Sequence, residues 1–264
     1  MVNNKLKIFA VCLAILASAG LSAQIRMVKP RLREPAALEL PRTDAGDIIV
    51  RHPGHVLCYN PDWMIPNWVA YELKAEELDG NAERERYFSP DPALEQYERA
   101  EHWHYTHSGW VRGHMIPAGD LKYDQEAMTA SFYTSNICPM NMTFNNSIWK
   151  RLEEKVRKLA YEFGRVYIIT GPVMGENQYG KVGESNIFVP DGFFKAILVP
   201  KGNSYLAAGF LMPNSEDAQG KLRDYVMTVD DLEDLVGMDL FFSLSPAVAR
   251  EVEAALPLKE LGLY

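Results

Sequence analysis

The chain has 264 residues, of which 47% are hydrophobic and 23% are charged, as expected for a globular protein with a core. Its 27 basic and 35 acidic residues give a formal net charge of −8. This balance excludes a protein that coats nucleic acid with a uniformly basic surface, but it permits a small basic cleft on an acidic body.

The first residues have the pattern of a secretory signal peptide. Lys5 and Lys7 form a short positive stretch, and residues 8–16 form an apolar run that is too short to span a bilayer. Small residues follow, which predicts cleavage after Ala19 or Ala23 and a periplasmic or secreted protein without stable membrane association. The alternative is an uncleaved membrane anchor. Cleavage removes two lysines and no acid, so −8 becomes about −10.

The chain therefore divides into three predicted parts. Residues 1–23 form the signal peptide. Residues 24–47 are polar, contain prolines and show no sustained period, which indicates a linker or a loosely attached arm. Residues 48–264 form the folded domain.

Two cysteines remain after export, Cys58 and Cys138. An oxidising compartment permits a disulfide between them. Two buried free thiols are an equal alternative, because free cysteine behaves as a small hydrophobic residue.

The first half of the folded domain is predicted to begin with strands. Residues 55–59 and 67–73 have strand composition, with the turn residues 60–62 between them. Residues 76–101 are charged and contain prolines, which is typical of a loop. Residues 131–137 are again rich in aromatic and β-forming side chains.

A helix is predicted over residues 145–163. Apolar residues recur at spacings of three and four, and Gly164 ends the pattern. The recurring residues are Ile148, Leu152, Val156, Leu159 and Phe163.

The second half is predicted to be mainly β. The predicted strands are residues 166–170, stopped by Gly171 and Pro172; residues 186–189 and 193–199, paired as a hairpin; and residues 204–211. Short helices are predicted over residues 228–235 and 246–255. Because strands and helices mix without βαβ alternation, the predicted class is α+β, with helices packed on an antiparallel sheet.

His114 is the leading candidate for a catalytic residue. Its ordinary pKa is close to neutral pH, so it can take a proton from water at modest cost. Arg112 and Gly113 precede it, and glycine permits a close backbone approach. A lone histidine is more commonly a core or surface residue, and its neighbours in the sequence favour the catalytic interpretation.

Asn145 is the candidate metal ligand. Its amide oxygen is a neutral, hard ligand that suits Mg²⁺, an ion that takes few protein ligands. The alternative is a helix N-cap, a position that asparagine favours strongly.

Glu153 and Arg157 follow Asn145 on the same predicted helix. They form an i,i+4 pair in the favourable order, which as a solvated pair contributes only a few tenths of a kcal/mol. In a functional role, the glutamate would hold a metal-bound water and the arginine would neutralise charge on a phosphate.

Three histidines, His102, His104 and His107, form a further cluster. A zinc site would need additional ligands that the sequence does not offer nearby. We therefore expect the polar end of a strand there rather than a metal site.

The order and spacing of the motifs around these residues resemble the DNA/RNA non-specific endonucleases of the ββα-metal superfamily, relatives of endonuclease G. The run RGHMIPAGD is followed by SNICPMNMTFNNSIWKRLEEKVR. The similarity continues through VYIITGP, IFVPDGFFKAIL and LMPN to LEDLVGMDLFF, and so covers about residues 58–242.

The resemblance implies a role for each candidate. His114 would be the general base that activates water, and Asn145 would be the single protein ligand of Mg²⁺, with Mn²⁺ as a substitute. Glu153 would hold metal-bound water, and Arg157 would stabilise and bind the phosphate. The fold would be a central antiparallel sheet with packed helices and a ββα-metal catalytic core.

The resemblance also implies three supporting residues. Arg86, in the segment RYFSPDP, would be a second arginine that binds and stabilises phosphate. Asn136 would support the site and the bound substrate, and Arg112, the arginine of the signature motif, would be among the catalytic residues. Residues 48–264 would then be an endonuclease domain that cuts DNA and RNA to 5′-phosphate ends.

One position departs from the family pattern. The family usually reads Asp-Arg-Gly-His, whereas Val111 stands in place of the aspartate. Valine offers neither a charge nor a hydrogen bond. Two other functions therefore stay open: a catalytically impaired nucleic-acid-binding protein on the same scaffold, and a phosphodiesterase for small nucleotides.

Overall fold

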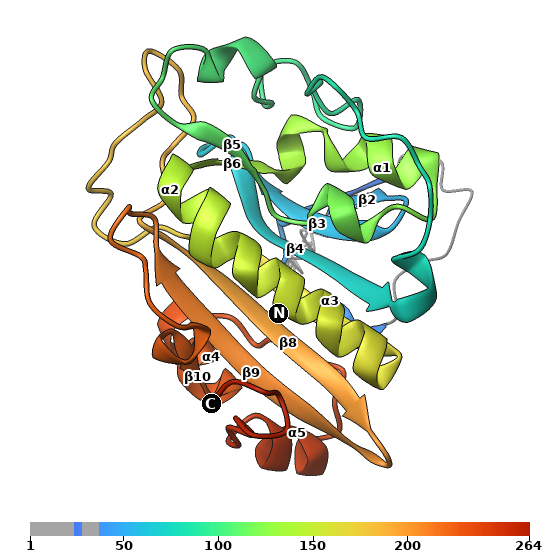
Figure 1. Ribbon diagram of the computed structural model, residues 1–264. Coiled ribbons are helices and arrows are strands. Elements are labelled where there is room, and N and C mark those ends of the chain that lie inside the picture. Colours follow the sequence, from blue (N-terminus) through green and yellow to red (C-terminus); the bar gives the residue numbers. More distant parts are fainter. Residues whose placement is uncertain (1–23, 28–36) are drawn as a thin grey trace, which may run out of the picture.

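An eight-stranded sheet runs through the molecule (Figure 1). The computed structural model describes residues 24–27 and 37–264, so the predicted signal peptide lies outside the described residues. The strand order is β1-β2-β3-β4-β7-β8-β9-β10, with β1 and β2 parallel and the other neighbouring pairs antiparallel. The strands are β1 (Gln24–Met27), β2 (Ile48–His52), β3 (His55–Asn60), β4 (Ile65–Lys74), β7 (Arg165–Val173), β8 (Gly192–Lys201), β9 (Ser204–Pro213) and β10 (Val226–Met227).

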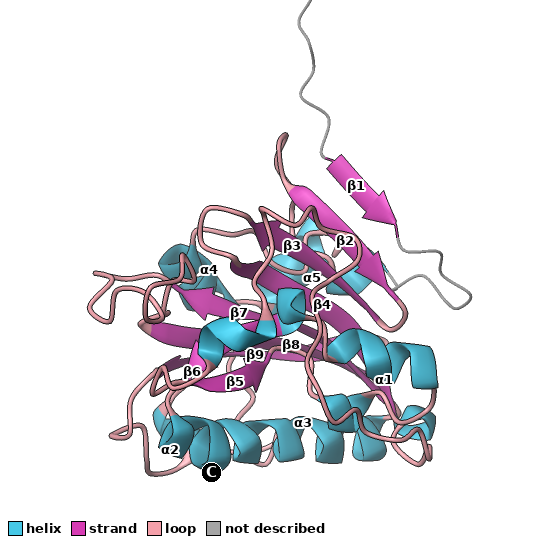
Figure 2. Cartoon of the chain, turned by 90° about the horizontal axis from the view of Figure 1, so that it is seen from above, coloured by secondary structure: helices cyan, strands magenta, loops and turns pink. Residues whose placement is uncertain are grey.

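Helices cover both faces of this sheet, as Figure 2 shows. One face carries α3 (Lys150–Phe163), and the other carries α4 (Val229–Val236) and α5 (Pro246–Val252). The alternation of side chains along β8 makes both layers possible. Phe193 and Ile197 pack in the core on the α3 side, whereas Phe194 and Leu198 pack in the core on the α4 side. The predicted α+β class with a central antiparallel sheet is confirmed.

A two-stranded ribbon and the long helix that follows it form a ββα unit on the α3 side. The ribbon consists of β5 (Val111–His114) and β6 (Ile137–Met140), paired so that His114 lies opposite Ile137. The chain then enters α2 (Met142–Phe144), a π-helical turn (Asn145–Trp149) and α3. The predicted helix over residues 145–163 is confirmed. Its apolar stripe is buried except for the partly buried Phe163, and Gly164, with a φ of 86°, ends it.

The remaining helical segments are short. They are α1 (Gln125–Ser131), whose N-terminus the Asp124 side chain caps, and a set of 3₁₀ turns. These turns are η1 (Ala37–Glu39), η2 (Ala75–Glu77), η3 (His102–Tyr105), η4 (Ala118–Asp120), η5 (Thr134–Asn136) and η7 (Leu222–Asp224). The strand character expected over residues 131–137 is wrong, because α1 and η5 occupy most of that stretch. In the described part of the chain, no helix has the length and apolar character needed to cross a membrane.

Two predictions about the second half of the sheet are also wrong. Strand β7 continues through Gly171 and Pro172 to Val173. Proline is tolerated there because β4 pairs with β7 only as far as Thr170, so the missing N–H costs no ladder bond. The expected hairpin of residues 186–189 and 193–199 does not form either, since β8 pairs with β7 and β9.

The predicted arm is not loose along its whole length. Strand β1 pairs with β2 from Gln24↔Ile48 to Met27↔Arg51. Leu38 and Leu40 pack against the core on the α4 side, and Glu39 is buried. Residues 37–40 therefore belong to the folded body, although their polar neighbours indicate a linker.

Candidate active site

His114 lies at the end of β5 in an aromatic setting. Its ring centre is 4.9 Å from that of Phe132 and 5.3 Å from that of Phe88. The side chain is half-buried, and Nε2 is enclosed without a hydrogen-bond partner among the described residues. Burial, followed by the positive charge of Arg84, lowers the pKa of His114 to about 3. The imidazole is therefore neutral at neutral pH, which is the form that accepts a proton.

Two arginines, Arg84 and Arg86, lie in the loop between η2 and η3 and line one surface hollow. The Arg84 guanidinium is 5.0 Å from the centre of the Phe132 ring, which also contacts His114. Sequence reasoning missed Arg84, although it alternates with Arg86 in the run ERER. Arg86 is exposed and makes no hydrogen bond or ion pair within residues 37–264. Both arginines are thus available to an incoming anion.

The Arg112 side chain packs on aromatic rings and bonds to the backbone of the site. Its guanidinium lies 5.3 Å from the Tyr105 ring centre and 5.7 Å from that of Phe88. Its Nη2 donates a hydrogen bond of 2.5 Å to the carbonyl of His102. Phe88 also contacts the His114 ring, so Arg112 holds in place an aromatic side chain that packs against the histidine. This geometry favours a positioning role over the catalytic role expected from the sequence.

Asn136 is buried and its side chain is hydrogen-bonded to the backbone, which favours a supporting role over contact with substrate. Its Oδ1 accepts from the Ile116 N–H at 3.0 Å, and its Nδ2 donates to the carbonyls of Ile116 and Ser131 at 3.1 and 2.8 Å. The backbone carbonyl of Asn136 accepts from the Met115 N–H. Asn136 therefore fixes the two residues that follow His114, and no polar atom of its side chain is left for a ligand.

Asn145 is not the helix cap, which removes the alternative interpretation of this residue. The cap is Asn141, whose Oδ1 accepts from the backbone N–H groups of Thr143 and Phe144. Asn145 has helical backbone angles and opens the π-helical turn, a rare geometry that is frequent at functional sites. Its amide is half-buried and makes no hydrogen bond in the described part of the chain. The oxygen is therefore available to a hard cation.

A second asparagine, which the sequence reasoning did not single out, holds the start of this helix. Asn214 is buried, and its Oδ1 accepts from the Asn141 N–H at 2.7 Å. Its Nδ2 donates to the carbonyls of Pro139 and Pro190. Asn214 belongs to the motif LMPN, so the motif pointed to it, but without a role.

Glu153 and Arg157 are partly buried and form a charge cluster with the buried Asp120. Arg157 Nε donates to Asp120 Oδ1 at 2.6 Å, and Arg157 Nη2 lies 3.6 Å from Glu153 Oε2. The second oxygen of Asp120 accepts from the Tyr71 hydroxyl at 3.1 Å. Burial raises the pKa of Glu153, and the nearby charges of Lys195 and Arg157 oppose this rise. The pair is thus held in place, and it is not the solvated surface pair of the alternative interpretation.

Lys195 completes the cluster from strand β8. It is fully buried, its ammonium lies 4.8 Å from the Trp149 ring centre, and it has no hydrogen-bond partner among the described residues. Burial lowers its pKa, whereas Glu153 and Asp120 act to raise it. The negative charges of Asp120 and Glu153 are therefore balanced by the positive charges of Arg157 and Lys195, as charges removed from water must be. The sequence feature that could have singled out Lys195 is its position inside the apolar run FFKAIL.

Three further sequence questions have structural answers. Val111 pairs with Met140 and packs, half-buried, against the main core, so its role here is packing. The expected strand end at the histidine cluster is wrong, because η3 is a 3₁₀ turn in which His104 Nδ1 accepts from the Glu101 N–H. Cys58 and Cys138 are free buried thiols, not a disulfide.

Comparison with known proteins places this geometry in a family. The family model for DNA/RNA non-specific endonucleases matches residues 39–247. The mouse mitochondrial nuclease EXOG is 34% identical over 212 residues, covering 75% of this chain and 58% of the mouse protein. The mitochondrial nuclease of Saccharomyces cerevisiae is 31% identical over 232 residues, covering 78% and 70%. A crystal structure of the complex of EndoG with its inhibitor EndoGI has a TM-score of 0.72 and 25% identity, covering 82% of this chain and 96% of that chain.

These relatives correct one prediction. Nucleases named as mitochondrial recur among them, from mouse, human and two yeasts, so the predicted periplasmic or secreted location is contradicted. The chain spans only 58–60% of the length of the mouse and zebrafish EXOG proteins. The family itself is shown by the match over residues 39–247 and by identities above 30%. The chain belongs to the DNA/RNA non-specific endonuclease family.

Proposed function

We propose that this protein is an endonuclease that hydrolyses phosphodiester bonds of both DNA and RNA, with His114 as the general base. The observation that carries the proposal is the neutral imidazole of His114 at the end of the ββα ribbon, with the positive charge of Arg84 beside it. A neutral base next to a cation suits the attack of water on an anionic ester. The names of the relatives, which describe mitochondrial nucleases, support nuclease activity and a mitochondrial location.

In this reaction, His114 takes a proton from water as the water oxygen bonds to phosphorus. The bond between phosphorus and the 3′ oxygen breaks, the leaving oxygen takes a proton from solvent, and the product carries a 5′ phosphate. Arg84, whose guanidinium lies over the Phe132 ring, and the exposed Arg86 bind the phosphate. Contacts to phosphate carry no sequence information, which accounts for cleavage without sequence specificity.

The residues of the helix fit a divalent cation. Asn145 would hold it through its amide oxygen, which no backbone group occupies, and Glu153 would accept hydrogen bonds from water around it. A bound Mg²⁺, for which Mn²⁺ could substitute, would supply positive charge to the phosphate and the leaving oxygen. Arg157 adds a second positive charge, and its ion pairs with Asp120 and Glu153 keep it oriented. The family is metal-dependent, and Mg²⁺ is the proposed ion.

The test is a plasmid-nicking and RNA-cleavage assay on wild type, His114→Ala and the control His102→Ala. Loss of the base lowers the rate by about 10²–10⁴-fold at unchanged thermal stability. His102 offers a matched control, because its side chain is exposed and outside the aromatic pocket. EDTA abolishes cleavage by all three proteins. A His114→Ala rate within a few-fold of wild type refutes the assignment, and wild-type cleavage of small diesters but not of DNA refutes the endonuclease.

A further inference from the structure

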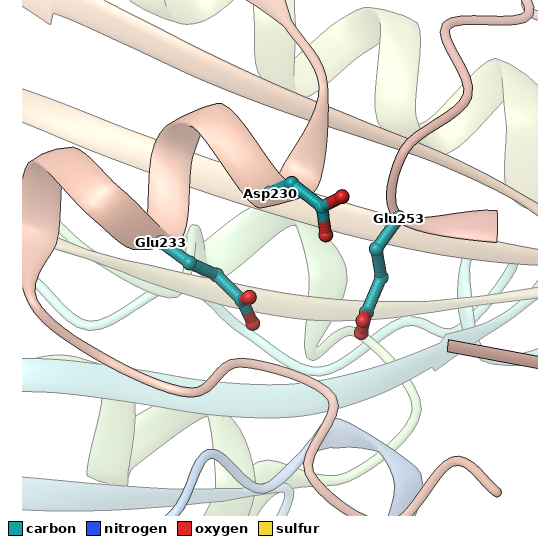
Figure 3. A group of neighbouring side chains, drawn as sticks. All are labelled: Asp230, Glu233 and Glu253. Atoms are coloured by element: carbon teal, nitrogen blue, oxygen red, sulfur yellow. The ribbon is translucent and has the colours of Figure 1, made fainter. Parts of the chain in front are cut away.

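Three carboxylates gather on the face of the sheet that carries α4 and α5, away from the layer of His114. Figure 3 shows Asp230 and Glu233 on α4 and Glu253 just after α5, with their carboxylates directed toward one another. One oxygen from each lies within 4.8 Å of the others. Asp230 is exposed, Glu233 is half-buried, and Glu253 is 8% exposed.

The backbone holds this cluster together without any ligand. The carbonyl of Glu253 accepts hydrogen bonds from the N–H groups of Val229 and Asp230 at 3.0 and 3.2 Å. The end of α5 therefore caps the beginning of α4. Glu233 is fixed as well, because its Oε1 accepts from the Leu240 N–H at 2.6 Å. Its other oxygen remains for a ligand.

Glu253 is the most buried member of the cluster, and its carboxylate has no partner among the described residues. Within residues 37–264 its carboxylate makes no hydrogen bond and no ion pair, although only 8% of the residue is exposed. The nearby base Arg42 pairs with Asp239 at 3.7 Å instead. A buried carboxylate beside two others is costly unless a cation or a proton compensates it.

We propose that Asp230, Glu233 and Glu253 form a second cation site, which binds Ca²⁺ and is separate from the catalytic site. Calcium takes 6–8 oxygen ligands at about 2.3–2.6 Å in flexible geometry, so ligands of one ion lie at most about 5 Å apart. The separations in the cluster meet this limit. The exposure of Asp230 leaves room for the waters that complete the shell. Magnesium is the poorer fit, because it demands near-ideal octahedral geometry.

The consequence is structural. The ion joins the start of α4 to the end of α5, and both helices pack on the core through Val229, Leu232 and Val252. Binding to the folded state alone raises its stability by mass action. The bound ion therefore stabilises the packing of α4 and α5 on the sheet.

The experiment is thermal unfolding of the full chain in EDTA and in Ca²⁺, with Ca²⁺ binding measured by titration calorimetry. At a Ca²⁺ concentration about 100 times the Kd, the wild-type Tm rises by about 5–10 °C. Glu253→Gln removes this rise, and in EDTA it melts above wild type, because a repelled buried charge is gone. Asp230→Asn, at an exposed position, also reduces the rise. The control Glu251→Gln, an exposed acid on α5, responds to Ca²⁺ as wild type does.

The outcomes distinguish a bound cation from a bound proton as the group that compensates the Glu253 carboxylate. A Ca²⁺-dependent rise that Glu253→Gln leaves intact overturns the proposal. A wild type that shows no rise, with Glu253→Gln more stable in EDTA, also overturns it and assigns the compensation to a shared proton. The comparison uses variants that differ only in this cluster, so it holds whether or not Asn145 binds the catalytic metal. Replacing Ca²⁺ by Mg²⁺ gives a smaller rise at equal concentration.

Discussion

Replacing Asp120 by asparagine tests the buried charge cluster most directly. The Asp120 side chain is 1% exposed, and it accepts from Arg157 Nε at 2.6 Å and from the Tyr71 hydroxyl at 3.1 Å. Asparagine keeps the shape and one acceptor but loses the charge. The guanidinium of Arg157 is then left with Glu153, at 3.6 Å, as its remaining acidic partner.

The expected cost follows from these contacts. Removing one partner of a buried ion pair costs about 3–5 kcal/mol. Two effects reduce this figure: burial raises the pKa of Asp120, so the desolvation of its charge is relieved, and Glu153 still pairs with Arg157. We therefore expect a loss of about 2–4 kcal/mol, which lowers the Tm by roughly 5–15 °C in a protein of this size.

The assay is differential scanning calorimetry, with cleavage rates measured well below the transition. The matched control is Asp79→Asn, because Asp79 also accepts a tyrosine hydroxyl, from Tyr161 at 2.8 Å, but is exposed. Its stability changes by less than about 0.5 kcal/mol. Asp120→Asn also lowers kcat, since Arg157 loses its orientation. A Tm shift no larger than that of the control refutes the reasoning.

Three other predictions concern buried groups. Burial, followed by the charge of His52, lowers the pKa of His55 from 6.5 to about 3, so on acidification the unfolded chain binds a proton before the folded one does. The free energy of unfolding therefore falls by about 2 kcal/mol between pH 7 and 5. Urea unfolding of His55→Leu shows a correspondingly weaker pH dependence. Asn136→Ala leaves three backbone groups unpaired, so it costs more than about 2 kcal/mol and lowers kcat with little change in KM; a raised KM with intact kcat contradicts its positioning role. Burial raises the pKa of Cys58 to about 12 and also raises that of Cys138, so a thiol reagent labels their peptides, as seen by mass spectrometry, only after denaturation.

The sequence predicted the elements whose signals are local. The buried stripe of α3 and its glycine stop were visible as a period of 3.6 residues and a terminal Gly164. The predicted end of β7 was wrong, and the packing of residues 37–40 was not visible in the sequence, because each depends on a partner elsewhere in the chain. Pro172 is accommodated by the end of the β4 ladder, and Leu38 and Leu40 are partly buried against the core on the α4 side.

The candidate site shows the same division. Motif order singled out His114, Asn145, Glu153 and Arg157, whose roles remain proposals. It could not show that Asn141, and not Asn145, caps the helix, since both asparagines lie where a cap is favourable. It also could not show that Asn136 is buried, because burial depends on the loops that fold over it.

The sequence by itself determined the α+β class, the long helix and the set of chemically capable residues around His114. Only the tertiary structure decided how those residues are charged and held. Asp120 and Lys195 come from segments far along the chain from α3, which carries Glu153 and Arg157, and the four residues meet because α3 packs across β4, β7 and β8. Burial and neighbouring charge set each pKa, and both depend on contacts between distant segments rather than on neighbours along the chain.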